Sequence, residues 1–477
     1  MSTIAPEAQT TAKARRAALA VALAPVLPAH CLLLCDEECA PFDCDGLPAF
    51  RQPALAVALP ETAAQVREVL RVCHRLQMPL VARGAGTGLS GGAMPHADGV
   101  VLSLAKLNRI LDIDPIACIA RVEPGVRNLA VSEAAAPHGL YYAPDPSSQI
   151  ACTIGGNVAE NSGGVHCLKY GLTIHNVLGL SGYTIDGTAI TLGSTALDAP
   201  GLDLLALAIG SEGLLVASFD DVVKAGDAVA AILAAGIIPA GLEMMDRKAT
   251  VAVEPFVHAG YDLEAAAILL AESDGTAEEV AEEIEAIERV VRAAGATRCV
   301  VSRSENERLK FWSGRKNAFP AAGRVSPDYY CMDGTIPRKH LGRMLQAIAQ
   351  MEEKYTLRCM NVFHAGDGNL HPLILFDANQ PGEWERAERF GADILELCVA
   401  LGGTITGEHG VGIEKINSMC VQFAPAEREA FFAVKRAFDP AGLLNPGKAI
   451  PTLVRCAEYG RMHVHRGALP FADLPRF

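Results

Sequence analysis

The sequence predicts an α+β protein with at least two domains. A chain of 477 residues is longer than a single hydrophobic core normally supports. Its first half alternates short apolar, strand-like segments with glycine-rich loops, whereas strand–helix–strand patterns follow from about residue 214. Apolar residues make up 50% of the chain and charged residues 20%, which is typical of globular proteins rather than disordered ones.

The expected elements of the first half begin with a helix, and its motifs are expected on loops. A strand–helix–strand unit then follows, and later strands are short, with Asp186-Gly187 as a hairpin turn between the last two. In order, the expected elements are a helix (12–29), a strand (54–59), a helix (62–76) and strands at 79–82, 99–104, 117–122, 183–186 and 188–192.

The second half is expected to form another α+β domain, built on an antiparallel sheet and followed by C-terminal helices. Its clearest helix, 276–294, places Val280, Ile284, Ile287 and Val291 on one face. The other expected elements are strands at 214–219, 266–270 and 298–302, a helix at 221–235, a helix at 384–401 ended by Gly402-Gly403, and a helix at 425–438 with Pro425 at its first position.

Charge excludes one class of partner. The formal net charge is −14 and there is no block rich in lysine or arginine, so we expect no nucleic-acid partner. An anionic substrate would therefore need a local cationic cluster or a bound metal.

Cysteine usage and the N-terminus predict the compartment. The 14 cysteines lie mostly beside apolar residues, as small buried side chains do in a reducing environment. The spacings of Cys31, Cys35, Cys39 and Cys44 match no zinc or iron–sulfur pattern. There is no basic signal-peptide region, and prolines interrupt the apolar stretch 17–34. A cytoplasmic protein is predicted, at most peripheral at the inner membrane through partners.

The segment Gly86-Thr87-Gly88-Leu89-Ser90-Gly91 has the G-x-G-x-x-G spacing of a dinucleotide-binding fingerprint. In dinucleotide-binding folds the motif lies at the start of a helix. Here Gly92 and Pro95 follow it closely, and both residue types disfavour a helix. An NAD-binding Rossmann fold is therefore not predicted. Residues 83–92 are expected to form a loop whose bare amides close around an anion, with a plain surface turn as the alternative.

A second run of small residues and hydroxyls covers 144–147 and 153–164. Such residues let the backbone approach a flat polar ligand. Plain turns would explain either segment alone, but two of them in one domain favour a large phosphate-bearing cofactor.

Two further glycine-bearing segments carry ionisable residues. His364 and His371 flank a Gly-Asp-Gly-Asn turn, which can fold them toward each other, and Glu408 and His409 lie between glycines. Two histidines and a glutamate can hold a divalent metal with positions left open, and a further histidine can act as a general base. Loop histidines satisfied by hydrogen bonds are the alternative.

Residues 442–448 have the G-x-x-x-x-G-K spacing of a phosphate-binding P-loop. We interpret them as a helix end and turn, because Ala449 replaces the Ser or Thr that a P-loop requires.

In their order along the chain, these segments resemble the FAD-linked oxidase family, whose flavin domain is of the vanillyl-alcohol-oxidase (PCMH) type. The motifs are His364–His371, Thr406–Gly412, and Phe438-Asp439-Pro440 with Leu444–Lys448. Within that family, the ending 456–465 is similar to the FAD subunits of bacterial glycolate oxidase (glycolate dehydrogenase) rather than to the neighbouring D-lactate dehydrogenases.

The resemblance implies a fold and domain boundaries. An N-terminal helical segment (1–50) would precede a PCMH-type FAD-binding domain (51–213). A ferredoxin-like substrate (cap) domain with the C-terminal helices (214–450) and a tail (451–477) would follow.

The resemblance also implies FAD and a divalent metal (Zn, Mn or Fe) as cofactors. His364, His371 and Glu408 would hold the metal, His409 would be the base, and Arg315 would clamp the substrate carboxylate; a salt-bridging helix arginine is the alternative for Arg315. The residues implied to contact FAD are Arg83, Gly84, Ala85, Gly86, Thr87, Gly88, Leu89, Ser90, Gly91, Gly92, Pro144, Asp145, Ser147, Gly155, Gly156, Asn157, Ala159, Asn161, Gly163, Gly164 and Glu212.

The implied activity is oxidation of a small 2-hydroxy acid, glycolate or D-lactate. Electrons would pass to an iron–sulfur partner subunit and then to a quinone, in a complex that also contains a second FAD-domain subunit. The chain departs from the family after Gly213, where material worth about two or three strands is missing. The FAD site would then be incomplete, or the chain an internally deleted form, so a non-catalytic subunit is the competing interpretation.

Overall fold

The computed structural model describes residues 6–47, 49–164, 166–194, 203–205, 218–219 and 221–451. The junction after Gly213, the predicted contact residue Glu212 and the ending 456–465 lie outside these residues. None of the helices in the described ranges combines the length and the apolar character that crossing a bilayer requires.

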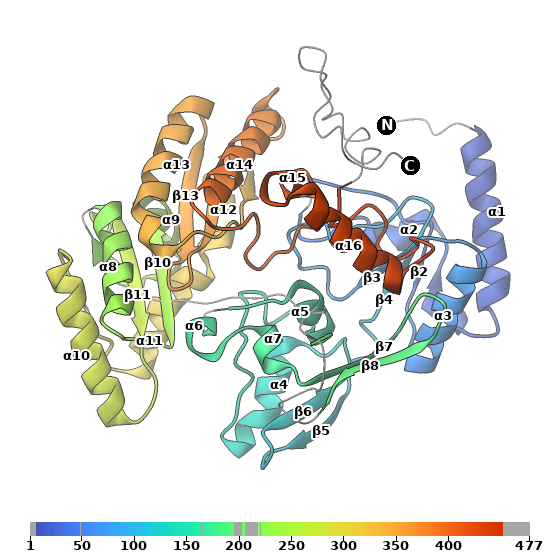
Figure 1. Ribbon diagram of the computed structural model, residues 1–477, viewed down its shortest axis with the longest axis horizontal. Coiled ribbons are helices and arrows are strands. Elements are labelled where there is room, and N and C mark those ends of the chain that lie inside the picture. The colour runs from blue at the N-terminus through green and yellow to red at the C-terminus, as the bar shows by residue number, and fades with distance from the viewer. Residues whose placement is uncertain are drawn as a thin grey trace.

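The first half is built on a four-stranded sheet (Figure 1) with the order β1-β2-β4-β3. Strands β2, β4 and β3 are parallel, and β1 pairs antiparallel with β2. Apolar side chains of α1 and α3, such as Leu19 and Val69, form one core with the sheet residues Leu80 and Val100. These elements are α1 (Pro6–Leu23), η1 (Ala29–Cys31), β1 (Leu32–Leu33), α2 (Asp36–Cys39), η2 (Ala40–Phe42), β2 (Ala56–Ala58), α3 (Ala63–Arg75), β3 (Leu80–Arg83) and β4 (Val100–Ser103).

Two hairpins and several short helices complete the first half. The predicted turn at Asp186-Gly187 is confirmed, with Gly187 at φ +81° and its N–H donated to Thr184. The elements are β5 (Ile110–Asp114), β6 (Ile119–Val122), α4 (Asn128–Ala135), η3 (Ala136–His138), α5 (Ile154–Glu160), α6 (Cys167–Tyr170), α7 (Thr173–Asn176), β7 (Gly179–Tyr183) and β8 (Ala189–Gly193).

The expectation that loops alone carry the motifs is wrong at α5. Thr153 caps this helix by accepting the N–H of Gly156 at 3.3 Å. The cap offsets the two glycines that made a loop the better prediction.

The second half forms a six-stranded, fully antiparallel sheet with the order β12-β14-β13-β10-β11-β9. The antiparallel sheet predicted for this half is confirmed. Its strands are β9 (Ser218–Phe219), β10 (Gly241–Asp246), β11 (Ala267–Glu272), β12 (Asp328–Cys331), β13 (Arg358–His364) and β14 (Asn369–Phe376).

Helices cover both faces of this sheet. One face packs against α8 (Val222–Ala234), α10 (Ala277–Ala293), α13 (Leu341–Tyr355) and α14 (Glu383–Ala400). The other face packs against α9 (Arg247–Val257), α11 (Glu305–Lys316) and α12 (Ala318–Val325). Both faces are therefore buried, which explains why the strands are almost continuously apolar rather than alternating.

Strand alternation determines which polar residues share a face. Met245 on β10, Val362 on β13 and Leu373 on β14 all pack on the side of α9, α11 and α12. Successive side chains of a strand point to opposite faces, so Glu243, His364 and His371 lie on that same side.

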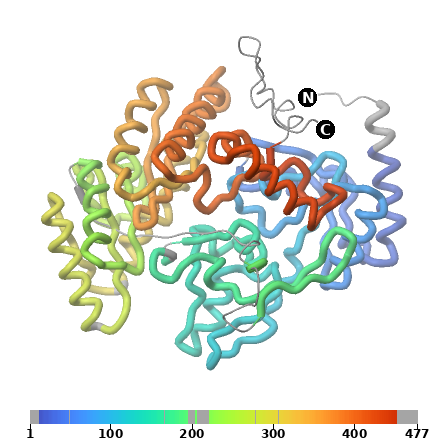
Figure 2. Tube along the Cα trace, viewed as in Figure 1, coloured from blue at the N-terminus to red at the C-terminus, as the bar shows by residue number. Residues whose placement is uncertain are grey.

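The C-terminal segment returns to the first sheet. The short helix η5 (Arg338–His340) precedes α13. After α15 (Met419–Gln422) and α16 (Pro425–Phe438), the chain runs beside β3. The N–H of Leu80 is donated to Leu443 O and the N–H of Asn445 to Leu80 O, each at 2.8 Å. Figure 2 shows this segment (red) passing between the two halves of the molecule.

The second half differs from the prediction in several places. Residues 298–302 do not form a strand, and Val300 and Val301 are about half exposed. Conversely, β10 and α9 occupy 241–257, where no element was predicted. Glu243 and Asp246 interrupt the apolar run of β10, which hides the strand from a pattern search.

Candidate active site

His364 and His371 face each other at one end of the β13–β14 hairpin. In the hairpin register His364 pairs with Asn369, and Gly368 takes φ +88° in the turn between the strands. The two imidazole centroids are 4.7 Å apart, and both side chains are buried. The predicted convergence of the two histidines is therefore present.

Glu408 approaches both rings from the glycine-flanked loop 406–412. Its Oε1 lies 3.0 Å from His364 Nε2 and 3.2 Å from His371 Nε2. One potential ligand atom from each of the three residues falls within 4.8 Å of the others. The three residues predicted to bind a metal thus form one cluster.

The ring nitrogens of His371 provide a test of whether a metal fits. Both are buried and neither makes a hydrogen bond, because Nε2 is close to Glu408 without being aligned for one. An unpaired polar atom in the interior is costly. A cation bound by this cluster would satisfy Nε2, so the residues present fit a divalent metal.

Glu243 orients His364, and sequence analysis missed it. This fully buried carboxylate on β10 accepts the Nδ1–H of His364 at 2.6 Å, which turns Nε2 toward Glu408. Burial lowers the pKa of His364, but Glu243 and Glu408 outweigh it and raise the pKa to about 10. Two carboxylates on one imidazole favour a positive charge at this point, either a proton or a metal.

A second possible ligand group shares His371 and consists of Asp333, His371 and His409. Asp333 is a poor ligand, because both carboxylate oxygens already accept hydrogen bonds. Oδ1 accepts the N–H of Glu408 at 2.9 Å, and Oδ2 accepts the N–H of His409 at 2.9 Å and contacts Lys415 Nζ at 3.0 Å. The chemistry of the donors favours His364, His371 and Glu408 as the metal set.

His409 has the properties of a neutral base. Its ring stacks on His371, and its Nδ1 is buried without a hydrogen bond. Burial is the largest effect on the pKa of His409 and lowers it to about 4, although the nearby Asp333 carboxylate raises it. The imidazole is therefore uncharged at neutral pH and can accept a proton.

Arg315 joins the same cluster through Glu243. It lies on α11, is 2% exposed, and forms an ion pair with Glu243 through Nε. Its Nη2 is buried without a hydrogen-bond partner. Arg315 thus makes a salt bridge and also retains a free donor that suits a carboxylate.

The predicted FAD segments lie beside this cluster. Loop 83–92 begins at the end of β3, and its Ser90 O accepts the N–H of Ile413, just after loop 406–412, at 2.9 Å. A Cβ placed on Gly84 would meet Thr153, so this loop also packs against the start of α5. The four glycine-bearing segments converge between the two sheets.

The backbone at Gly88 and Gly92 fits a flat ligand. The atoms nearest to an added Cβ at Gly88 belong to the flexible Glu160 carboxylate; around Gly92, only that carboxylate and the Ser90 hydroxyl would approach it. Glu160 also lies near Gly410, and burial raises its pKa to about 8. Gly88 and Gly92 thus present backbone without a side chain beside Glu160 of α5, which is the kind of surface that a flat ligand can approach closely.

Some of the residues predicted to contact FAD also make hydrogen bonds that support the loops. The Oδ1 of Asn157 accepts a hydrogen bond from Asn128, and the Oδ1 of Asn161 accepts the N–H of Ile174. Asp145 accepts the N–H of His166, and its backbone fills the space beside Gly164. Ser147 and Ala159 are exposed. Arg83 donates to Cys44 O at 2.6 Å, which ties the loop to the N-terminal segment.

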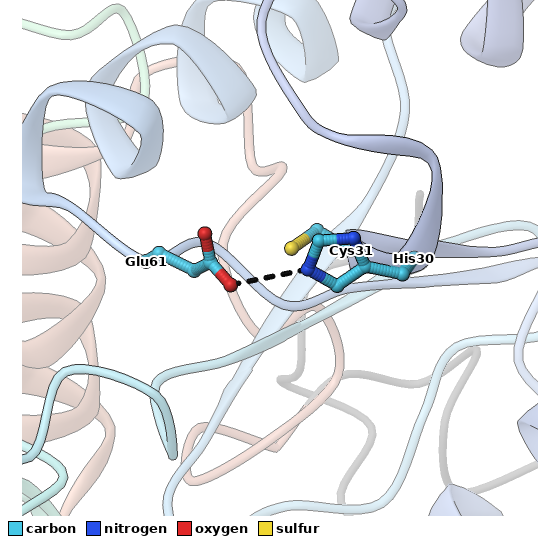
Figure 3. Close-up of side chains that lie close together, drawn as sticks. All are labelled: His30, Cys31 and Glu61. Carbon is cyan, nitrogen blue, oxygen red and sulfur yellow. Dashed lines mark hydrogen bonds and ion pairs between the residues drawn. The ribbon is translucent and has the colours of Figure 1, made fainter.

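Another potential ligand group, His30, Cys31 and Glu61, lies away from this site (Figure 3). His30 Nε2 is 3.2 Å from Glu61 Oε1. Lys106 Nζ lies 2.8 Å from the same oxygen and 3.2 Å from Cys31 Sγ. An ammonium group already supplies the positive charge there, so the arrangement does not call for a metal.

Two family models match the chain. Residues 54–193 match a model described as "FAD binding domain", and residues 211–449 match "FAD linked oxidases, C-terminal domain". Among solved structures, p-cresol methylhydroxylase with substrate bound superimposes with a TM-score of 0.73, covering 94% of this chain and 97% of that one. At 17% identity this likeness establishes the PCMH-type FAD-oxidase fold alone.

Curated relatives are much closer in sequence. The glycolate oxidase subunit GlcD of Escherichia coli (strain K12) is 59% identical over 482 residues, covering 97% of each chain. GlcD of Bacillus subtilis (strain 168) is 37% identical over 85% of this chain and 90% of its own. A D-lactate dehydrogenase of Archaeoglobus fulgidus is 31% identical over 83% and 91%. The alignment with the E. coli protein is longer than this chain of 477 residues, so that relative carries residues without a counterpart here.

Proposed function

The chain belongs to the FAD-linked oxidases, and on that premise we propose that it oxidises glycolate to glyoxylate. FAD is its redox cofactor, and when bound it supplies the acceptor for the hydride that leaves C2 of the substrate. The observation that carries the proposal is one buried cluster containing three potential metal ligands, a neutral histidine and an arginine with a free donor.

His364, His371 and Glu408 would hold a divalent metal, with zinc, manganese and iron all compatible with imidazole and carboxylate ligands. When bound, the metal would supply positive charge beside the hydroxyl and carboxylate oxygens of the substrate. Glu243 keeps the Nε2 of His364 directed toward that position by accepting the hydrogen of Nδ1.

Arg315 and His409 would act on the substrate directly. The unpaired Nη2 of Arg315 donates to the substrate carboxylate while Nε stays paired with Glu243. A ring nitrogen of His409 accepts the hydroxyl proton as the carbonyl of the product forms. His409 suits this step because it is held neutral beside His371.

D-lactate is the second candidate substrate, since it carries the same hydroxyl and carboxylate with one additional methyl group. Glycolate is favoured because the relatives named glycolate oxidase subunits are 59% and 37% identical, against 31% for the D-lactate dehydrogenase. A non-catalytic role is disfavoured, because a scaffold would not need the buried metal and base residues.

The word "subunit" in the relatives' names supports a hetero-complex. We propose that this chain assembles with a second FAD-domain subunit and an iron–sulfur subunit, and that electrons leave its flavin through the iron–sulfur subunit toward a quinone.

An anaerobic titration of the purified flavoprotein tests the substrate. Glycolate should bleach the flavin absorbance at lower concentration than D-lactate does, and L-lactate should have little effect. Faster bleaching by D-lactate would move the assignment to D-lactate dehydrogenase. A flavin that neither acid bleaches would support the non-catalytic alternative.

A further inference from the structure

Asp333 is a buried carboxylate that sequence analysis did not single out. It lies two residues beyond β12 and is 0% exposed. It accepts the backbone N–H groups of three successive residues, Gly407, Glu408 and His409, at 3.1, 2.9 and 2.9 Å. The backbone that carries the metal ligand Glu408 and the base His409 thus wraps around one carboxylate.

Two side chains complete the surroundings of Asp333. Thr406 Oγ1 donates to Oδ2 at 2.7 Å, and Lys415 Nζ lies 3.0 Å from the same oxygen. Lys415 is also fully buried, and it donates to Gly410 O at 3.1 Å, which closes the loop from its far side. Burial alone would raise the pKa of Asp333, but Lys415 holds it well below the usual range, so the carboxylate stays charged.

The loop needs such an anchor because of its composition. Glycines flank Glu408 and His409, and Gly410 and Gly412 take φ of +74° and +48°. Glycine-rich backbone has many accessible conformations and holds none of them by itself. The side chains of Glu408 and His409 must nevertheless meet His364 and His371 within a few tenths of an ångström for metal binding and proton transfer.

We propose that Asp333, with Lys415 as its counter-ion, is a positioning residue that fixes Glu408 against the two metal-binding histidines and His409 against the substrate. This role rests on the proposed function, since it acts through the metal ligand and the base assigned there. Asp333 does not bind the metal or touch the substrate; it sets the backbone from which both groups project.

The competing explanation is that Asp333 contributes only to general stability. Asp246 offers a matched control, because it is a buried carboxylate in the same domain with a comparable task. It accepts the N–H of Ala249 at 2.9 Å and the N–H of Asn361 at 3.0 Å. Its hydrogen bonds hold α9 and β13 rather than loop 406–412, so Asp246→Asn should lower the stability of the fold without moving Glu408.

The experiment compares the Asp333→Asn and Asp246→Asn variants of the full chain. Zn²⁺ affinity is measured by competition with a chromophoric chelator, and amide exchange of residues 406–410 by mass spectrometry. Asp333→Asn should weaken Zn²⁺ binding about 10- to 100-fold, as outer-shell substitutions typically do, and should speed exchange in the loop. Its kcat with glycolate should fall more than its KM rises, whereas Asp246→Asn should match the wild type in all three measurements.

Equal Zn²⁺ affinity and equal loop exchange in the two variants would overturn the proposal. If Asp333→Asn does not fold, Thr406→Val removes one donor from the carboxylate and leaves the charges paired. Thr250→Val, which removes a buried hydroxyl that donates to Asp246 O at 2.9 Å, is its control. Thr406→Val should then show a smaller change in the same direction, and a result identical to Thr250→Val would refute the role.

These readouts separate the two proposals. Zn²⁺ affinity and amide exchange do not depend on turnover. A wild-type protein that failed to oxidise glycolate would therefore remove the proposed function while the effect of Asp333 on the loop could still be measured.

Discussion

The imidazole of His409 lies face to face with that of His371, with centroids 4.8 Å apart and ring planes within 8° of each other. The proposed base is thus stacked on a proposed metal ligand. Because the pKa of His409 is lowered to about 4, the ring is available as a proton acceptor throughout the neutral range.

We expect His409→Ala to retain FAD and to lose flavin reduction by glycolate. Loss of a general base typically costs about 10²- to 10⁴-fold in rate, and anaerobic stopped-flow absorbance would measure it. His138→Ala, which changes an exposed histidine on η3, is the control. Near-normal bleaching in His409→Ala would exclude His409 as the base.

His364→Ala and His371→Ala should each lower the amount of metal that co-purifies with the protein, measured by elemental analysis. Glu243→Gln should retain the ligands but weaken metal affinity about 10- to 100-fold, because the amide no longer holds the Nδ1–H of His364 as a carboxylate does. Unchanged metal content in both alanine variants would remove the histidines as ligands.

Arg315→Lys should raise the KM for glycolate more than it changes kcat. A lysine can keep the ion pair with Glu243, but its single nitrogen cannot replace both Nε and Nη2 of the guanidinium. The charge-assisted hydrogen bond that is lost is worth about 1.5–3 kcal/mol. That corresponds to a loss of roughly ten- to a hundredfold in kcat/KM. Arg308→Lys is the matched control, since Arg308 lies on the same helix and pairs with Glu272 at 2.5 Å. Equal kinetics of the two variants would favour the purely structural interpretation of Arg315.

His166 should make stability depend on pH. Burial lowers its pKa, but Asp145 and Glu272 outweigh that effect and raise it from the usual value of 6.5 to about 10. Because the pKa of His166 is higher in the folded than in the unfolded protein, its protonation favours the folded state. This stabilisation is fully present below pH 6.5 and is lost as the pH rises toward 10. The difference in free energy of unfolding between wild type and His166→Gln, measured in urea, should therefore shrink across that range. A difference that stays constant across this range would contradict the assignment.

The junction after Gly213 leads to a prediction about FAD. The E. coli relative carries residues that this chain lacks. If these are the strands expected after Gly213, their loss would leave a sheet edge unpaired and the flavin without backbone partners. We expect this chain to bind FAD more weakly than a version with the relative's residues restored after Gly213, and to be less soluble when expressed alone. Fluorescence titration of both apo-proteins would decide, and equal dissociation constants would show that those residues are dispensable.

The sequence predicted best what depends on neighbouring residues. Pro425 placed the start of α16, and the apolar spacing of 280–291 predicted α10. The hairpin turn at Asp186-Gly187 was likewise local. The Gly-Asp-Gly-Asn turn predicted that His364 and His371 would meet, because a tight turn between two strands brings its ends together whatever surrounds it. FAD and the family followed from the order of the glycine-bearing segments.

The tertiary structure decided which residues hold the site in place. Glu243 and His364 are 121 positions apart, and Asp333 and His409 are 76 apart. No periodicity links such pairs, because β10 meets β13 through sheet pairing and Asp333 meets loop 406–412 through hydrogen bonds formed in the folded chain. A carboxylate in an apolar segment gives no local sign of its partner. Its charge becomes tolerable only when folding brings a histidine, an arginine or a lysine to it from a distant part of the chain.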